Sequence, residues 1–175
     1  MLASILSESN DLSKLEKAEH IATLIHSGAV RRGNNDPYIM HPMRIRAMAD
    51  LLGYDEDTQV VAYLHDTIED TLYKDKVKQV IVKYFGVNVL NSILLLTHEK
   101  NTSYTNYLFQ LAKNQSTMAE MAFRVKMLDM LDNVRESPSP RQKLKYKTAI
   151  EYLLSNGIDT QKIPDIIIIE LGITA

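Results

Sequence analysis

Apolar residues recur at helical spacing through most of this chain, and the alternation that is typical of strands is rare. Between Leu12 and Gly28, for example, they return every three or four residues. With only six glycines and five prolines among 175 residues, few positions favour a break. The sequence therefore predicts a single, almost entirely α-helical domain over residues 1–175.

Periodicity and capping residues place the expected helices along the chain. They lie at about residues 12–28, 42–52, 57–65, 75–84, 87–96, 103–113, 118–133 and 141–154. Asp57 is a candidate cap for the third of them. Residues 87–96 also fit a strand by composition, but the short linkers around them favour a helix. Residues 159–169 fit a short helix or a strand.

Composition excludes several classes of protein. Because the chain has no cysteine, it is neither a disulfide scaffold nor a thiol enzyme. Its 20 Lys+Arg against 22 Asp+Glu give a formal charge of −2, which argues against general binding to nucleic acid. No apolar run approaches the roughly 20 residues of a membrane helix. The N-terminus has no secretion-signal pattern, so we expect a cytoplasmic protein.

Four ionisable side chains follow the apolar run 60–64 within six residues. If the helix continues through them, His65 and Glu69 lie one turn apart, and Asp66 and Asp70 form a second pair on a neighbouring face. A buried carboxylate without a partner costs several kcal/mol. A divalent metal would supply that partner, although an acidic helix end can also be simply a solvated face.

A second carboxylate and a second histidine raise the case for a metal. Asp129 lies in an apolar stretch of a predicted helix with Asn133 one turn on, and His41 begins another helix. The alternative for Asp129 is a lone surface position. Two imidazoles and two carboxylates suit manganese, iron, zinc or nickel. The acidic pair Glu69 and Asp70 could then orient and deprotonate a metal-bound water.

Four blocks of sequence carry a further signal. They are Arg31-Arg32 with Asp36-Pro37-Tyr38-Ile39-Met40-His41-Pro42; Leu64-His65-Asp66-Thr67-Ile68-Glu69-Asp70-Thr71; Phe85-Gly86-Val87; and Lys126-Met127-Leu128-Asp129 with Asn133. Together they resemble the HD-domain phosphohydrolases, and within them the RelA/SpoT-type (p)ppGpp hydrolases, including the small stand-alone members. The resemblance covers about residues 14–154 and leaves 155–175 as a C-terminal extension.

The resemblance implies an all-α HD-domain helical bundle that holds Mn²⁺, or another divalent transition metal, through His41, His65, Asp66 and Asp129. It implies that two carboxylates activate the attacking water, namely Glu69 and Asp70. It also implies that four side chains contact the substrate, namely Arg31, Arg32, Lys126 and Asn133. Asp132 departs from the family, whose long enzymes usually have histidine there.

The expected function is metal-dependent removal of the 3′-pyrophosphate of (p)ppGpp, with a guanine nucleotide as partner and no nucleic acid or membrane. Arg32 replaces the usual lysine and the loop after it is one residue longer, so hydrolysis of another nucleotide, such as a nucleoside mono- or triphosphate or NADPH, is the alternative. A non-catalytic nucleotide-binding regulator is a third interpretation. The Ile166–Ile169 run is suited to pack on the core or on a second copy in a homo-oligomer.

Overall fold

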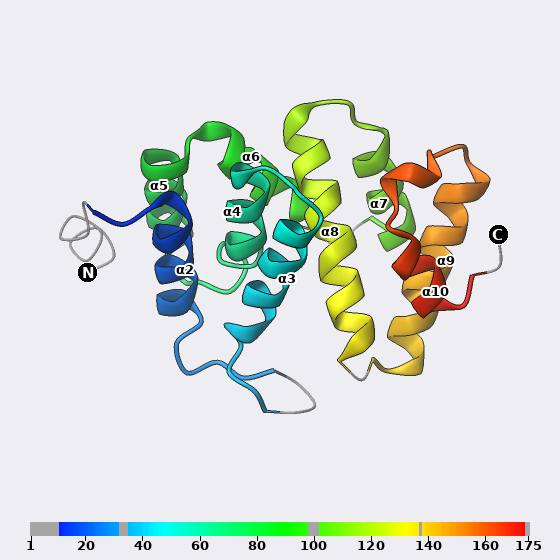
Figure 1. The fold of residues 1–175 in the computed structure, drawn as a ribbon, viewed down its shortest axis with the longest axis horizontal. Coiled ribbons are helices and arrows are strands. Elements are labelled where there is room, and N and C mark those ends of the chain that lie inside the picture. Colours follow the sequence, from blue (N-terminus) through cyan, green and yellow to red (C-terminus); the bar gives the residue numbers. More distant parts are fainter. Residues whose placement is uncertain (1–10, 32–34, 98–101, 137, 174–175) are drawn as a thin grey trace.

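A computed structural model describes residues 11–31, 35–97, 102–136 and 138–173. Within these ranges the regular structure is helical, and the one strand-like pairing is an isolated bridge between Val30 and Pro37. The elements, labelled in Figure 1, are α2 (Lys14–Ile25), α3 (Met40–Leu51), α4 (Glu56–Leu64), α5 (Lys74–Phe85), α6 (Val87–Leu96), α7 (Tyr104–Lys113), α8 (Thr117–Arg135), α9 (Pro140–Ser155), the 3₁₀ turn η1 (Thr160–Lys162) and α10 (Asp165–Leu171).

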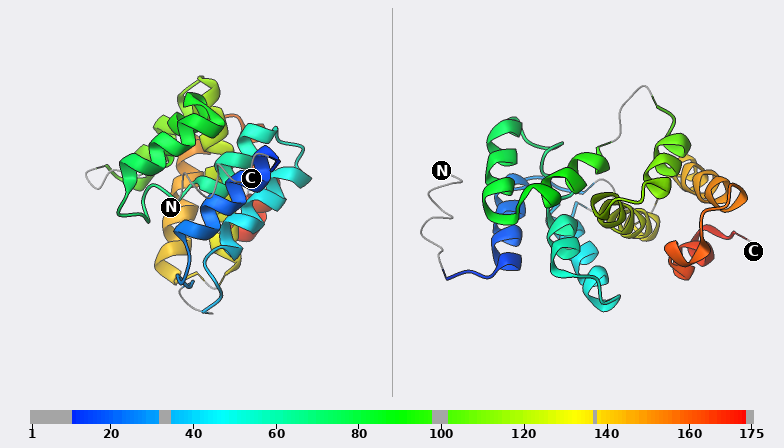
Figure 2. Two further views of the ribbon diagram at one scale, coloured as in Figure 1. Left: turned by 90° about the vertical axis from the view of Figure 1, so that its left-hand side faces the viewer. Right: turned by 90° about the horizontal axis from the view of Figure 1, so that it is seen from above.

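Helix α8 is the central element. It lies between the group α2–α6 and the helices α7, α9 and α10, as the views in Figures 1 and 2 agree. It packs against α3, α4, α6, α7 and α10. Side chains on several faces of α8 are therefore buried, including two carboxylates, Asp129 and Asp132.

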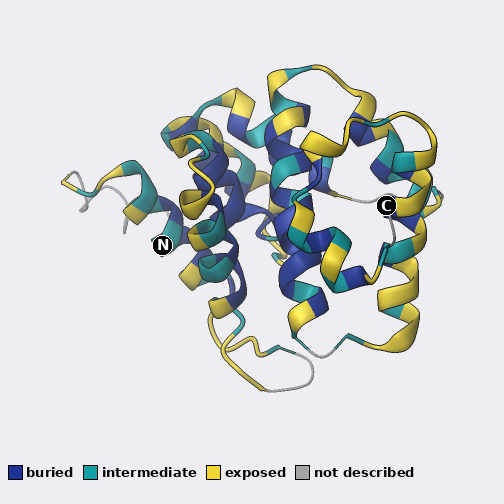
Figure 3. Cartoon of the chain, turned by 45° about the vertical axis from the view of Figure 1, so that its right-hand side comes forward, coloured by how far each residue is buried: buried dark blue, intermediate teal, exposed yellow. Residues whose placement is uncertain are grey.

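Apolar burial joins these helices into one cluster. Figure 3 shows buried residues on the helix sides that face one another and exposed residues mostly outside. The C-terminal extension takes part, because Ile163, Ile167 and Leu171 are buried and α10 packs on α8 and α9. Packing on the core, one of the two expectations for this tail, is thus observed. No helix among the described residues is long and apolar enough to cross a membrane.

Side-chain caps explain where most helices begin. The hydroxyls of four serines accept a hydrogen bond from the backbone N–H three residues on, at Ser13, Ser103, Ser116 and Ser139. At α4 the cap is Asp55, whose Oδ1 accepts from Thr58 N at 2.7 Å. The expectation that Asp57 caps this helix was wrong, because Asp57 already lies in its first turn.

The continuation of α4 through His65 to Asp70, on which the pairing of His65 with Glu69 depended, does not occur. The helix ends at Leu64, and residues 65–69 form successive turns. The Leu64 carbonyl accepts both from Thr67 N, at 3.0 Å, and from Thr67 Oγ1, at 2.6 Å. These bonds end the i to i+4 ladder, so the one-turn pairing of His65 with Glu69 does not arise from a helix face.

Candidate metal centre and adjoining pocket

Four of the predicted side chains converge from three elements. His41 comes from the first turn of α3, His65 and Asp66 follow α4, and Asp129 lies in the middle of α8. Asp129 Oδ1 lies 3.2 Å from His41 Nε2 and 4.0 Å from His65 Nε2. Asp66 Oδ2 lies 3.0 Å from His65 Nε2 and 4.0 Å from His41 Nε2. Atoms that bind one cation at about 2.1 Å are about 3–4 Å apart, so the spacing fits a shared ion.

Hydrogen bonds on the far side of each imidazole fix the nitrogen that faces this point. His65 Nδ1 donates to the Ala62 carbonyl at 2.9 Å, and His41 Nδ1 donates to Asp132 Oδ2 at 2.6 Å. In its neutral form each imidazole then presents the lone pair of Nε2 to this point. His65 Nε2 is buried and makes no hydrogen bond with any described residue. Such an unsatisfied lone pair among carboxylates fits a divalent transition metal.

The two candidate ligand carboxylates are held ionised. Burial opposes the charge on Asp129, but the Lys126 ammonium, 2.9 Å from its Oδ2, and the neighbouring histidines hold its pKa well below the usual range. Asn133 Nδ2 donates to its other oxygen at 2.6 Å. Asp66 Oδ2 accepts from the Tyr38 hydroxyl at 2.5 Å. Both carboxylates are therefore ready to bind a cation.

The same carboxylates favour a proton on His65. Burial opposes that charge, but Asp66 and then Asp129 outweigh it and raise the pKa of His65 to about 9. A metal can bind this imidazole only after the proton leaves. Metal binding at this centre should therefore release protons near neutral pH.

Sequence reasoning gave no partner for Asp132 and did not single out Arg44 or Glu136. Arg44 Nε and Nη2 donate to the two oxygens of Asp132 at 2.7 and 2.9 Å, and Nη2 also reaches Glu136. His41, Asp132 and Glu136 therefore do not form a second metal site, because the guanidinium already occupies it. The signal in the sequence is polar spacing at the end of α8 and its C-cap, where four polar residues recur at i, i+3, i+4 and i+7: Asp129, Asp132, Asn133 and Glu136.

A cavity of about 600 Å³ adjoins the metal centre. Its polar wall is formed by His26, Arg31, Tyr38, Asp70, Asn133, Glu136 and Gln142. The ring of His26 lies 4.6 Å from that of Tyr38, and the Arg31 guanidinium lies 5.4 Å from the same ring on the pocket wall. Tyr38 and Asn133 line the cavity and also donate hydrogen bonds to the candidate ligands Asp66 and Asp129. Hydrogen bonds therefore connect the cavity wall to the metal centre.

Of the other predicted residues, Asp70 lines this cavity. Glu69 and Asp70 are exposed in the turns after α4, and Asp70 lines the cavity with its Oδ2 3.5 Å from His26 Nδ1. Burial, followed by the charges of Asp66 and Glu69, raises the pKa of Asp70. The Lys126 ammonium is directed at Asp129. Arg32 lies outside the described residues.

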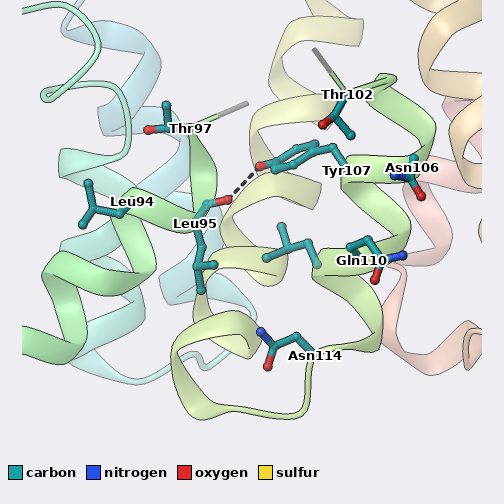
Figure 4. Close-up of a pocket in the computed structure, with 9 residues that line it drawn as sticks. Leu94, Leu95, Thr97, Thr102, Asn106, Tyr107, Gln110 and Asn114 are labelled. Carbon is teal, nitrogen blue, oxygen red and sulfur yellow. Dashed lines mark hydrogen bonds between the residues drawn. The ribbon is translucent and has the colours of Figure 1, made fainter. Parts of the chain in front are cut away.

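A separate cavity of about 420 Å³ lies between α6 and α7 (Figure 4). Tyr107 borders it and donates its hydroxyl to the carbonyls of Leu95 and Leu96, at 3.1 and 3.0 Å. These carbonyls belong to the last turn of α6, so Tyr107 joins the two helices. None of the four candidate metal ligands lines this cavity.

A protein-family model described as an HD domain matches residues 18–136, which contain all four candidate ligands. The chain belongs to the HD-domain family. Among curated proteins, this HD domain is 28% identical over 152 residues to the bifunctional (p)ppGpp synthase/hydrolase RelA of Mycobacterium tuberculosis, covering 82% of this chain and 20% of that protein. It is 28% identical over 146 residues to the guanosine-3′,5′-bis(diphosphate) 3′-pyrophosphohydrolase of Aquifex aeolicus, covering 79% and 20%.

The HD domain therefore spans about a fifth of the length of these relatives. Among solved structures, it is similar to a metazoan ortholog of SpoT that hydrolyses ppGpp, with a TM-score of 0.69 and 21% sequence identity. The match covers 93% of this chain and 98% of that chain. The expected all-α HD-domain fold is thereby confirmed.

Proposed function

We propose that this HD domain is a metal-dependent nucleotide phosphohydrolase that removes the 3′-pyrophosphate of (p)ppGpp and leaves GDP or GTP. The observation that carries the proposal is the convergence of His41, His65, Asp66 and Asp129 on one point, with a buried, unsatisfied imidazole nitrogen. The names of the two curated relatives supply the substrate class.

These four side chains would hold Mn²⁺, the metal to test first among divalent transition metals. When bound, the ion supplies a Lewis acid and lowers the pKa of a coordinated water. Glu69 and Asp70 then have the role of taking the proton from that water. The raised pKa of Asp70 supports this role, because a more basic carboxylate holds a proton better.

The cavity would bind the nucleoside part of the substrate. Arginine stacks on nucleobases and also binds phosphate, and Arg31 lies on the cavity wall with the rings of His26 and Tyr38. Asn133 bridges this wall to the metal ligand Asp129. We assign Arg31 and Asn133 to nucleoside binding, Lys126 to the charge of the metal-side phosphate, and Arg32 to the substrate on resemblance alone.

The decisive experiment is a substrate panel on protein stripped with a chelator and reloaded with Mn²⁺. The panel contains ppGpp, pppGpp, GTP, GMP and NADPH, and phosphate, pyrophosphate and triphosphate are measured separately. We expect pyrophosphate with GDP or GTP from the first two. Hydrolysis of only the other nucleotides would favour the second interpretation, and tight ppGpp binding without turnover would favour a regulator.

A further inference from the structure

Glu136 lies between two arginines at the edge of the cavity. Its Oε2 accepts from Arg31 Nε at 2.7 Å, and its Oε1 accepts from Arg44. The Glu136 and Arg31 side chains are only 16% and 13% exposed, so water screens this pair weakly. Water therefore screens the Arg31–Glu136 pair less than it screens the exposed ion pairs elsewhere on the molecule.

The Arg44 side chain is itself held in place by Asp132. Its guanidinium binds both oxygens of Asp132, which is buried and also accepts from the metal ligand His41. A bidentate arginine–carboxylate pair has defined geometry. Arg44 does not line the cavity, and its connection to the cavity wall is its hydrogen bond to Glu136.

Arg31 links Glu136 to Asn133, and through it to the candidate ligand Asp129. Its Nη2 donates to Asn133 Oδ1 at 2.7 Å, and Asn133 donates to the ligand Asp129. Hydrogen bonds thus run from one metal ligand, His41, through the cavity wall to another, Asp129. An arginine side chain loses conformational entropy when it is fixed, and these hydrogen bonds already fix Arg31 before a ligand binds.

We propose that Glu136 and Arg44 are positioning residues that fix the Arg31 guanidinium at the wall of the nucleotide pocket. The effect on nucleotide affinity rests on the proposed function, whereas the fixing of Arg31 does not. Glu136 and Arg44 touch neither the metal ligand atoms nor the acidic pair at residues 69–70. Loss of Glu136 should therefore raise KM and leave kcat nearly unchanged, whereas loss of Arg44 also removes the partner of Asp132 behind His41.

The kinetic test compares Glu136→Ala in the wild-type and Arg31→Ala backgrounds. In the wild type we expect Glu136→Ala to raise the KM for ppGpp about tenfold, with kcat within about threefold. In the Arg31→Ala background Glu136→Ala should not raise KM further. Additive effects in the two backgrounds would overturn the proposal.

A second readout needs no nucleotide. Nitrogen-15 spectra report how fast the arginine Nε–H protons exchange with water, and the Arg31 signal is identified by its loss in Arg31→Ala. Glu136→Ala and Arg44→Gln should speed this exchange. The matched control is Glu170→Ala, which breaks the exposed pair with Arg135, 3.1 Å apart, and should leave the Arg31 signal unchanged.

The two readouts separate the inference from the proposed function. If the panel shows no (p)ppGpp hydrolysis but exchange of the Arg31 proton speeds up as expected, the proposed function fails and the positioning of Arg31 stands. If ppGpp is hydrolysed but exchange is unchanged in Glu136→Ala, the positioning proposal is overturned.

Discussion

Replacing Asp132 with asparagine should weaken the metal centre without touching a ligand. Asp132 Oδ2 accepts from His41 Nδ1 at 2.6 Å, and the two side chains are 6% and 1% exposed. Loss of such an outer partner typically costs 10–100-fold in metal affinity, or about 1.4–2.7 kcal/mol. Asparagine keeps the size but removes one of the two negative charges that balance Arg44. A metal ion bound by His41 would then experience more of the positive charge of Arg44. We therefore expect a loss of metal affinity in the upper half of this range.

The assay is calorimetric titration of Mn²⁺ into chelator-treated protein at neutral pH. Asp50→Asn is the matched control, because Asp50 pairs with Arg46 on the exposed side of the same helix as His41, 3.5 Å apart. Circular dichroism checks that both variants keep their helices. If Asp132→Asn binds Mn²⁺ within about twofold of the wild type, the argument that Asp132 supports His41 is refuted.

Further outcomes follow from single side chains. Asp66→Ala should purify without metal by elemental analysis, and retained metal would exclude it as a ligand. Glu69→Ala should keep the metal and lower turnover about 10²–10⁴-fold; full activity would contradict its assigned role. Leu64→Ala, at a fully buried position, should cost about 2–5 kcal/mol in urea unfolding, and a loss below this range would contradict tight packing there. Burial lowers the pKa of His26 from 6.5 to about 4. The unfolded chain therefore binds this proton first, and stability should fall by at most about 3 kcal/mol as pH drops from 6.5 to 4. In chelator, His26→Gln should reduce this fall, and an unchanged pH dependence would refute the assignment.

Helix positions were largely predictable because burial on one side imposes a repeating pattern on each helix. The structure has a helix at each expected place, including residues 87–96, where composition alone also allowed a strand. The residues at which helices begin and end were less predictable. Asp55 and Asp57 both suit a cap, and only the backbone geometry at Thr58 decides between them.

The candidate ligands were predictable because their residue types and order match a family pattern, and the structure brings the four together. The turns after Leu64 were missed because His65 to Asp70 also fit a helical pattern, whereas the Thr67 hydroxyl competes for the Leu64 carbonyl. The contacts of Asp132 with Arg44 were missed because they join residues 88 positions apart. Spacing within one helix does not reveal such partners.

The half-buried ammonium of Lys126 separates folding from metal binding, which coincide in many small metal-binding proteins. A zinc finger unfolds when its ion leaves, since nothing else offsets the charge of its ligands. Here the Lys126 ammonium lies 2.9 Å from Asp129 Oδ2 and offsets the charge of this candidate ligand without a metal ion. The empty polypeptide can therefore reach its final shape first and acquire its ion later. The supply of divalent ions, rather than the yield of folding, would then limit how many molecules become active.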